Sequence, residues 1–528
     1  FPYTTLFRSS IYTVNKSGGF ILTTDDGVAF TEYEYDRFGN TTGIRYFDAR
    51  KNPVLSGARF PHMYASKISR YDDRGNAVEE WFRGTDNQPV VTKHRFSGWK
   101  LRYDEKGRIV AGTFLGTDGA PTLQADGIAG WEARYGENGE VAELRHLGLD
   151  GRLTLDSKGV AQVRFVFSQD AVETRNLGLD GKPVRDKSGY AISVLTRDRN
   201  GNPIRHAFFD VNRRPAPNNS GCASWRATYN EIGDLTEYFC LGGDGNPALE
   251  KKGFSSFRTE YDRQGNRVRE WYYGTDGKPT LRRDGYAASR MAYDDNGYQT
   301  EKWYLGLDEK PILNKEGLAG VKTTFDERGN RVEQWFHGVD GGLVASSEGI
   351  AGWISVFNDR NQETERRYYG PDRKPAANRD GVFGWKDEYN DHGNMVRRQH
   401  LDAQGVVAPN LYRVAIVELT YDPNHNLVEE RYLGSDQKPV LHGQRRIAGV
   451  RKKYAPSGNL AREENFGLDG TLTNDSTGTA YILYQYHPNH HRKSAVLYNQ
   501  AGEMLTETIY DLSGEERRKD PSPPAPRR

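Results

Sequence analysis

Glutamates, aspartates and tryptophans are the side chains of this sequence that could transform or bind a ligand, and each recurs at a fixed distance from one motif. The motif is Tyr-Asp-x-x-Gly-Asn, as at residues 261–266, and its first residue is numbered position 0. Position 8 carries a glutamate in seven copies: Glu79, Glu143, Glu237, Glu301, Glu333, Glu365 and Glu429. A carboxylate can serve as a general acid or base, but an active site is made once, whereas a structural position is made many times. We therefore expect these glutamates to be structural and the chain not to be an enzyme.

Aspartates recur in every kind of turn that the sequence predicts, and calcium binding is the chemistry that they could support. Examples are Asp72, Asp86, Asp276 and Asp284. Calcium requires several oxygen ligands that converge on one ion, whereas each turn offers about one carboxylate. Aspartate also favours turns because its side chain accepts hydrogen bonds from the nearby backbone. We expect these aspartates to form turns rather than ion sites.

A histidine-rich segment at residues 486–491, Tyr-His-Pro-Asn-His-His, stands where a turn is expected. A metal site is one interpretation of this segment, and a degenerate terminal turn is the interpretation that we favour. The sequence contains no phosphate-binding loop, zinc-protease helix, nucleophile elbow or paired-cysteine zinc motif. We expect no catalytic, cofactor or metal site.

All nine tryptophans occupy two positions of the repeated segment. Five lie at position −4 and four at position 10, namely Trp99, Trp131, Trp225, Trp353 and Trp385, then Trp81, Trp271, Trp303 and Trp335. If the motif closes a three-residue hairpin loop, these two positions face each other across the hairpin. The pairs predicted on this basis are Trp271 with Phe257, Trp303 with Ser289, Trp335 with Val321, Trp131 with Arg145, and Trp353 with Arg367. The rings then form the hydrophobic spine of the array, and the alternative is an exposed aromatic ladder that stacks sugar rings.

The two cysteines, Cys222 and Cys240, belong to one predicted hairpin. Under the same pairing they are offset from a direct cross-strand pair, which strains the geometry of a disulfide. We expect two buried thiols, with a disulfide as the alternative. So few cysteines do not identify the compartment of the protein.

The motif holds its register along almost the whole chain, which is the strongest signal in the sequence. Position 0 falls at Tyr35, Tyr71, Tyr103, Tyr135, Phe167, Arg197, Tyr229, Tyr261, Tyr293, Phe325, Phe357, Tyr389, Tyr421, Tyr454 and Tyr486. Eleven of the fourteen intervals are 32 residues long, and the others are 36, 30 and 33. A fixed period of this length is the signature of a repeat architecture.

One unit, residues 261–292, shows the elements of each repeat. In order, these are a turn at 261–266, a strand at 268–273, a second turn at 274–279, a weak strand at 280–281, a third turn at 284–285 and a strand at 287–292. Asp262 suits the first position of a type I turn, and Gly265 suits the left-handed conformation that closes the loop. No apolar pattern is long enough for a helix. Consecutive aromatic residues, as at Tyr272 and Tyr273, indicate that both faces of this strand meet other residues, and a bulge is the alternative.

The repeats contain too many strands for one open twisted sheet, because sheets beyond about ten strands curl or split. We expect an all-β fold in which tandem 32-residue β-hairpin repeats form one continuous antiparallel sheet, wound into a spiral, solenoid or shell. A propeller is the alternative, although its blades usually need about 40–45 residues.

Composition argues against several classes of partner. Basic and acidic residues number 73 and 72, so the net charge of +1 gives no reason to expect nucleic acid or an anionic membrane. No apolar run approaches the roughly 20 residues of a membrane-spanning helix. Hydrophobic residues make up only 36%, with 58 glycines and 31 tyrosines, which suits turn-rich sheets rather than disorder.

The chain divides into five segments by these signals. Residues 1–10 resemble a translated sequencing adapter from an environmental (metagenomic) assembly and are set apart as an artefact, so the natural start and any export signal are expected upstream. Residues 11–34 are a partial repeat, 35–485 the tandem repeats, 486–515 an atypical capping repeat and 516–528 a disordered proline-rich tail.

The recurring Tyr-Asp-x-x-Gly-Asn turn resembles the YD repeats of bacterial Rhs-type proteins, over about residues 26–515. In that family the repeats wind into a spiralling β-sheet that can enclose a toxin, and the proteins are exported or displayed. The resemblance therefore implies an extracytoplasmic or cell-surface protein of bacterial origin. This sequence departs from the family in its longer period, which adds a second hairpin turn as at residues 177–184, and in lacking the family's C-terminal core motif. It is similar to a divergent YD-like array, and neither a toxin nor a self-cleaving site is implied.

Three functions follow from these observations. The first is a non-enzymatic structural or interaction scaffold, because the repetition is uniform and catalytic motifs are missing. The second is a carbohydrate-binding surface that uses the tryptophans and the abundant tyrosines. The third is the non-catalytic repeat region of a larger bacterial toxin or enzyme. We expect a protein or glycan partner, no nucleic acid and no membrane insertion.

Overall fold

The computed structural model describes residues 7–12, 28–48, 50–56, 64–92, 94–390, 393–422, 426–455, 459–487, 492–510 and 516. These residues form 32 strands and no helix. From β2 to β30, each even-numbered strand spans positions −5 to 0 and so ends on the residue that marks the repeat.

The even-numbered strands are β2 (Phe30–Tyr35), β4 (Ser66–Tyr71), β6 (Gly98–Tyr103), β8 (Gly130–Tyr135), β10 (Gln162–Phe167), β12 (Ile192–Arg197), β14 (Ser224–Tyr229), β16 (Ser256–Tyr261), β18 (Ala288–Tyr293), β20 (Gly320–Phe325), β22 (Gly352–Phe357), β24 (Gly384–Tyr389), β26 (Ile416–Tyr421), β28 (Gly449–Tyr454), β30 (Tyr481–Tyr486) and β32 (Met504–Ile509). The odd-numbered strands are β1 (Phe7–Tyr12), β3 (Thr41–Phe47), β5 (Ala77–Arg83), β7 (Ile109–Leu115), β9 (Val141–Leu147), β11 (Ala171–Leu177), β13 (Pro203–Phe209), β15 (Leu235–Leu241), β17 (Arg267–Tyr273), β19 (Gln299–Leu305), β21 (Arg331–His337), β23 (Glu363–Tyr369), β25 (Met395–Leu401), β27 (Leu427–Leu433), β29 (Leu460–Phe466) and β31 (Arg492–Tyr498).

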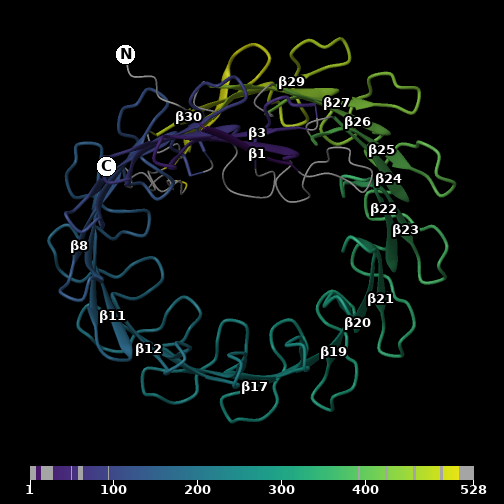
Figure 1. Cartoon of the computed structure of the whole chain (residues 1–528). Helices are drawn as coiled ribbons and strands as arrows, with labels where there is room; N and C mark the ends of the chain where they lie inside the picture. The colour runs from purple at the N-terminus through teal and green to yellow at the C-terminus, as the bar shows by residue number, and fades with distance from the viewer. Residues whose placement is uncertain are drawn as a thin grey trace, which may run out of the picture.

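All the strands belong to one sheet, in which each strand pairs antiparallel with the next along the chain. The sheet bends into a ring around an open centre, and the last strands return to the side of the ring where the first strands lie (Figure 1). Arg95, in a turn between β5 and β6, and Tyr486, at the end of β30, lie close enough to influence each other's pKa. The end of β30 therefore lies near the turn between β5 and β6.

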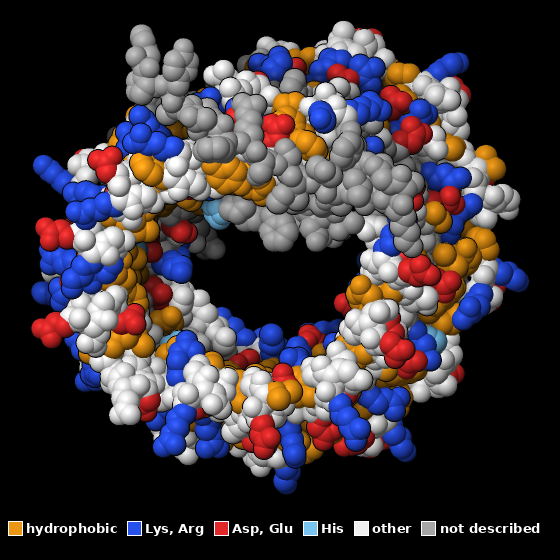
Figure 2. Space-filling view, in the orientation of Figure 1, with side chains coloured by type: hydrophobic (Ala, Val, Ile, Leu, Met, Phe, Trp, Pro, Cys, Tyr) orange, Lys and Arg blue, Asp and Glu red, His pale blue; other side chains and the backbone are white. Residues whose placement is uncertain are grey.

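This arrangement confirms the predicted all-β fold and its continuous sheet of hairpin repeats. The described strands do not separate into blades, as a propeller would require. Charged side chains of both signs are spread around the ring (Figure 2), in agreement with the near-zero net charge.

The predicted weak strand at residues 280–281 is wrong. The segment after the second turn makes only a single bridge, between Tyr273 and Pro279, and one backbone hydrogen bond from Thr280 to the carbonyl of Tyr272 at 3.0 Å. Units with leucine or valine in place of proline, as at Leu153 and Val407, make the same single bridge, so the short pairing is a property of the repeat and not of the proline.

The structure describes only part of the segments predicted at the two ends of the chain. Residues 7–10, which resemble part of an adapter, belong to β1, and β1 pairs with β2 from Phe7 to Tyr12. The predicted tail at 516–528 lies outside the described residues except for Glu516, which forms one bridge with Tyr510.

A bulge lies beside the tight turn of nearly every hairpin. In the hairpin of β16 and β17, Tyr261 pairs with Arg267, but the next pair is Glu260 with Arg269, so Val268 has no partner opposite it. The extra residue moves every later pair by one position. Position 10 therefore faces position −3, and position −4 faces position 11.

Apolar side chains are buried on both faces of the sheet, as the consecutive aromatic residues predict. On one face, called the Tyr272 face, Phe254, Tyr272 and Tyr286 form a cluster. On the other, called the Trp303 face, Trp303 packs with Ala288 and Leu305. Each layer runs from unit to unit, so the core of the molecule is two thin belts rather than one centre.

Candidate functional site

The tyrosine at position 0 joins eight of the units to the unit before them. Its hydroxyl donates a hydrogen bond to the carbonyl oxygen of position 6 in the preceding unit, at 2.8–3.1 Å. The pairs are Tyr71 to Thr41, Tyr103 to Ala77, Tyr135 to Ile109, Tyr229 to Pro203, Tyr261 to Leu235, Tyr389 to Glu363, Tyr454 to Leu427 and Tyr486 to Leu460. Burial raises the pKa of Tyr389 to about 12, so its hydroxyl stays a donor at neutral pH. These tyrosines are structural links between units.

The aspartates of the tight turns are held by their own turns, as predicted. In the turn after β16, Asp262 Oδ1 accepts hydrogen bonds from the backbone N–H groups of Gln264 and Asn266 at 2.9 and 2.8 Å. The side-chain amide of Asn266 donates to the other carboxylate oxygen at 3.0 Å, and this bond leads the causes that lower the pKa of Asp262. Gly265 closes the loop with a φ of 85°, which is a conformation that favours glycine.

The predicted facing pairs of the tryptophans are wrong, because the bulge moves the pairing by one residue. The observed partners are Arg258 for Trp271, Arg290 for Trp303, Lys322 for Trp335, His146 for Trp131 and Tyr368 for Trp353. Since neighbouring residues of a strand point to opposite faces, the two tryptophan positions lie on opposite faces of the sheet. Tryptophans at position −4 belong to the Tyr272 face, and those at position 10 belong to the Trp303 face.

The tryptophan side chains are packed to different degrees. Four are buried, namely Trp303, Trp335, Trp353 and Trp385, with 6–9% of their surface exposed. Five are half-buried, namely Trp81, Trp99, Trp131, Trp225 and Trp271. The half-buried rings also have partners: Trp99 lies 5.4 Å from Phe82 and from Phe96 between ring centroids. Sugar binding by these rings remains a prediction.

Each tryptophan at position 10 lies opposite a small residue of the next hairpin. The pairs are Trp81 with Gly98, Trp271 with Ala288, Trp303 with Gly320 and Trp335 with Gly352. A Cβ atom on Gly320 would lie 2.6 Å from Cε3 of Trp303. The ring therefore occupies the space that a side chain on the neighbouring strand would fill. In the sequence, a glycine or alanine follows each of these tryptophans after seventeen residues, and this spacing could have predicted the contact.

The glutamates at position 8 have structural partners on the Trp303 face. Glu301 accepts a hydrogen bond from the indole N–H of Trp303 at 3.0 Å and pairs with the ammonium group of Lys322 at 2.8 Å. Glu79 and Glu333 accept indole hydrogen bonds in the same way, at 2.8 and 3.2 Å. These three carboxylates fix the indoles, and Glu301 also bridges to the neighbouring hairpin through Lys322.

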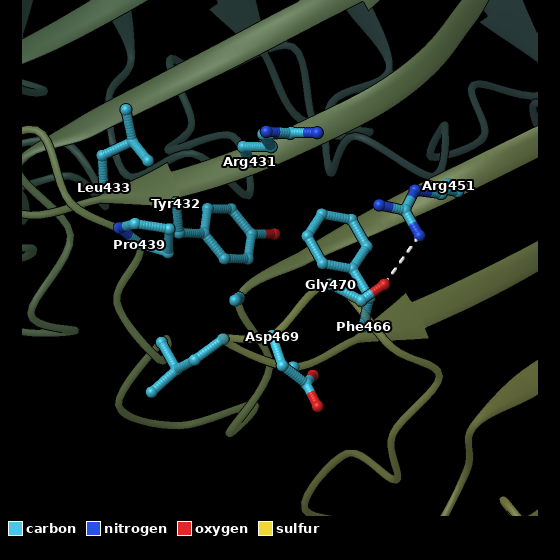
Figure 3. A pocket seen from close by; sticks show the side chains of 11 residues that line it. Arg431, Tyr432, Leu433, Pro439, Arg451, Phe466, Asp469 and Gly470 are labelled. Atoms are coloured by element: carbon cyan, nitrogen blue, oxygen red, sulfur yellow. Dashed lines mark hydrogen bonds between the residues drawn. The ribbon is translucent and has the colours of Figure 1, made fainter.

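A groove recurs between neighbouring units on the Trp303 face, and the residue at position 10 decides whether it is filled. The ring of Trp335 fills one copy, where the guanidinium of Arg373 stacks on it at 4.6 Å. Where position 10 is Arg431, the groove remains open as a cleft of about 340 Å³ (Figure 3). Its walls include Pro439 and Phe466 together with Arg431, Tyr432, Leu433, Arg451, Asp469 and Gly470.

The two cysteines form a disulfide, so the expectation of two thiols is wrong. Cys222 and Cys240 have Cα atoms 5.3 Å apart and are completely buried. Cys240 faces Trp225 in the sheet, whereas Cys222 precedes the first residue of β14, Ser224. Cys222 therefore lies outside the strand register from which the expectation was derived. The disulfide occupies the place that Phe254 and Tyr272 fill in the next unit.

The described residues contain no group of three or more histidines, cysteines and acidic residues arranged to hold a metal ion. His487 contacts the carbonyl oxygen of Tyr510 through Nε2 at 3.1 Å, while residues 488–491 of the histidine-rich segment lie outside the described residues. The described part of the chain includes no helix long and apolar enough to span a membrane.

No family model and no curated protein matches the chain. Solved structures with partial similarity include the crystal structure of TcdB2-TccC3-Cdc42, with a TM-score of 0.29 and 12% identity over 91% of this chain and 26% of that one. The Tc holotoxin pore of Photorhabdus luminescens gives a TM-score of 0.26 and 12% identity over 93% of this chain and 26% of that one. A porin-like protein from Bacteroides uniformis gives 0.19 and 10% identity over 51% of this chain and 88% of that one. The chain thus spans about a quarter of the length of the toxin chains that it matches.

Proposed function

We propose that the chain is a non-enzymatic scaffold that binds a protein partner along its ring. The observation that carries this proposal is that the reactive side chains which recur in the array are engaged in holding it together. Tyrosine hydroxyls link successive units, turn aspartates fix their own loops, and glutamates hold indoles and cations, as Tyr261, Asp262 and Glu301 do. The array is further proposed to be a divergent YD-like repeat, since the Tyr-Asp-x-x-Gly-Asn motif closes each tight turn.

Exposed aliphatic side chains at the second turn provide the surface for such a partner. Leu149, Leu179, Leu307, Val339 and Leu468 occupy equivalent places at the tips of these turns and are 46–58% exposed. Single exposed leucines are ordinary on a protein surface, whereas aligned ones mark interaction sites. The repeat places these side chains one unit apart wherever the turn contains them.

Affinity capture with the full chain tests this proposal. Serine at Leu149, Leu307 and Leu468 is expected to abolish capture of a partner from a bacterial lysate. The matched control places serine at Leu249, Leu281 and Leu313, which are 43–54% exposed in the adjoining loop, and is expected to leave capture unchanged. Equal capture by both variants, or failure of the unaltered chain to capture any protein, would contradict the proposal.

The disulfide supports an extracytoplasmic location for this scaffold. Disulfides persist in oxidising compartments and are rare in the bacterial cytosol. Mass spectrometry of the protein from its native host, with free thiols blocked before extraction, tests this point. A linked Cys222–Cys240 peptide is expected, and blocked free thiols at both positions would contradict the location.

Carbohydrate binding is a second candidate, and the half-buried tryptophans favour it. Trp271 is half-buried beside Arg269, whose guanidinium lies 4.8 Å from the ring centroid. A glycan array probed with the full chain and with Trp271→Ala tests this candidate. Glycan binding that the substitution removes would support it, and the absence of any bound glycan would exclude it.

A further inference from the structure

Two arginines share one carboxylate at the open groove between β27 and β29. Arg451 Nε donates a hydrogen bond to Glu429 Oε2 at 2.7 Å, and Arg431 Nε donates to the other oxygen of the same carboxylate. Burial disfavours the charged form of Glu429, but the hydrogen bonds from Arg451 and Arg431 outweigh it and lower the pKa. One ionised carboxylate therefore faces two permanent cations.

The neighbouring carboxylate is also occupied. Glu464 lies directly opposite Arg451 in the sheet, but it pairs with Arg462 at 2.6 Å and with Lys453 at 3.5 Å. At the rim, the carboxylate of Asp469 is turned away from both groove arginines (Figure 3) and accepts hydrogen bonds from Thr471 instead. Neither Glu464 nor Asp469 pairs with Arg431 or Arg451, so Glu429 is the one carboxylate bound directly to these two guanidinium groups among the described residues.

The guanidinium of Arg451 is fixed in place. Its Nη1 donates to the carbonyl oxygen of Gly470 at 2.9 Å, and the group lies 4.3 Å from the ring centroid of Phe466. Arg431 has only its Nε bond among the described residues, so its two terminal nitrogens are available to a ligand. The side chains of Arg431 and Arg451 are 50% and 35% exposed, so both are open to solvent. Planar guanidinium groups suit recognition of carboxylates through paired hydrogen bonds.

We propose that this groove binds a small organic carboxylate, with the acid group on Arg431 and Arg451 and the body of the ligand against Pro439 and Leu468. A cleft of about 340 Å³ accepts a ligand of the size of one sugar acid or one amino acid. The proposal does not rest on the scaffold function, although Leu468 belongs both to this groove and to the exposed residues of the second turns.

Other units show how the equivalent groove changes with the residue at position 10. Where position 10 is Arg45, the groove is also open, as a cleft of about 230 Å³ whose lining includes one arginine rather than two. In the unit of β21, position 10 is Trp335, and its ring fills the equivalent space against Gly352. In the unit of β23, position 10 is Arg367, and its Nη1 reaches across to the carbonyl oxygen of Asp402 at 3.2 Å. Arg431 makes no such contact across the groove among the described residues, so its terminal nitrogens remain available beside the ion pair that its Nε forms with Glu429.

Isothermal titration calorimetry of the full chain tests the proposal with two acids and their neutral counterparts. The acids are glucuronate and N-acetylglutamate α-amide, and the counterparts are glucose and N-acetylglutamine α-amide. We expect at least one acid to bind at least about tenfold more tightly than its counterpart, as expected for a charge-assisted hydrogen bond. Binding of only one acid identifies the source of the carboxylate as a sugar or an amino acid. Binding of neither acid, or equal binding of the neutral compounds, overturns the proposal.

Two variants locate the binding at this groove. Arg431→Gln is expected to weaken binding of the acid by about tenfold, and Arg431→Trp is expected to abolish it by filling the groove as Trp335 does. Arg145→Gln, at the same position of another unit, is the matched control and is expected to leave binding unchanged. Circular dichroism verifies that each variant is folded. Unchanged affinity in a folded Arg431→Gln or Arg431→Trp protein overturns the assignment.

Discussion

At the scale of single residues, a tyrosine hydroxyl links eight of the units to the preceding one, and its removal has a local effect. Tyr261→Phe removes the hydrogen bond to the carbonyl of Leu235, and we expect a loss of about 1 kcal/mol in the local free energy of unfolding. Native-state hydrogen exchange of the amides in β15 and β16 measures this loss. Tyr293→Phe is the control, because the Tyr293 hydroxyl has no hydrogen bond among the described residues. Equal effects of the two substitutions would contradict the role of the hydroxyl.

In the unit that begins at Phe325, position 0 is phenylalanine, and a ring contact replaces the missing hydrogen bond of the tyrosine hydroxyl. Phe325 has no hydroxyl, and its ring stacks on Tyr298 with the centroids 5.0 Å apart. Tyr298 occupies the turn position that is asparagine in most units. The two departures from the repeat therefore compensate each other, which a motif search by itself treats as two separate losses.

The turn aspartates make stability depend on pH. The pKa values of Asp72 and Asp262 lie below their usual 3.8, chiefly because Asn76 and Asn266 donate side-chain hydrogen bonds to the ionised carboxylates. A lowered pKa in the folded state adds stability above the unfolded pKa, and this stability is lost as the pH falls through the folded pKa. We expect Asp72→Asn with Asp262→Asn to reduce the loss of stability between about pH 6 and pH 3. Urea unfolding at both pH values measures it, and an unchanged pH dependence would argue against these carboxylates.

Asparagine is a suitable replacement because the array already uses it. Asn230 stands at the same turn position, and its Oδ1 accepts the backbone N–H groups of Ile232 and Asp234 at 3.2 and 2.8 Å. The substitution therefore keeps the turn while it removes the ionisable group.

At the scale of strands and hairpins, the contact between Trp303 and Gly320 sets the spacing of two neighbouring hairpins. Gly320→Val places a side chain where the indole lies, and we expect a loss of about 1–3 kcal/mol from overpacking. The double variant with Trp303→Ala is expected to lose less than the sum of the two single variants, because the clash is removed. Thermal unfolding measured by circular dichroism gives the three midpoints. Additive losses would show that the two residues do not interact.

The sequence predicts the hairpins well because the turn residues and the alternation of the strands are local signals. Position 0 ends β16 at Tyr261, where the motif places it. The bulge at Val268 depends on how the turn twists the paired strands, and no residue type in the motif reports it. One missed residue then displaced every predicted cross-strand pair, so Trp271 was matched with Phe257 instead of Arg258.

The cleft at Arg431 could not be predicted from the motif either. It exists because position 10 changes from tryptophan to arginine in a unit where Glu429 holds that arginine through Nε. Whether an arginine reaches across the groove, as Arg367 does to Asp402, depends on the shape of the next turn. That shape is a property of two units together, and a single repeat does not contain it.

At the scale of the whole molecule, each hairpin contacts only the hairpins beside it, except where the ends of the ring meet. The proximity of Arg95 and Tyr486 shows that the sheet completes about one circuit before its last strands reach an early unit. Stability in such an array is approximately a sum of unit and interface contributions. Deleting whole units should therefore change only the position of the two ends around the ring. Deleting part of a unit should instead change the direction in which the remaining strands run, and so prevent their antiparallel pairing.

Removal of residues 261–292, one whole unit, is therefore expected to give a folded protein. In this variant β19 follows β16, and β19 runs in the same direction as β17, so the two strands can still pair antiparallel. Removal of residues 261–276 takes out β17 alone and leaves β16 followed by β18, two strands that run in the same direction. Parallel strands need a long crossover connection, which the remaining turn does not provide, so this shorter deletion is expected to misfold. Circular dichroism and size-exclusion chromatography compare the two proteins. A folded half-unit deletion, or an unfolded whole-unit deletion, would show that the 32-residue unit is not the independent element of this fold.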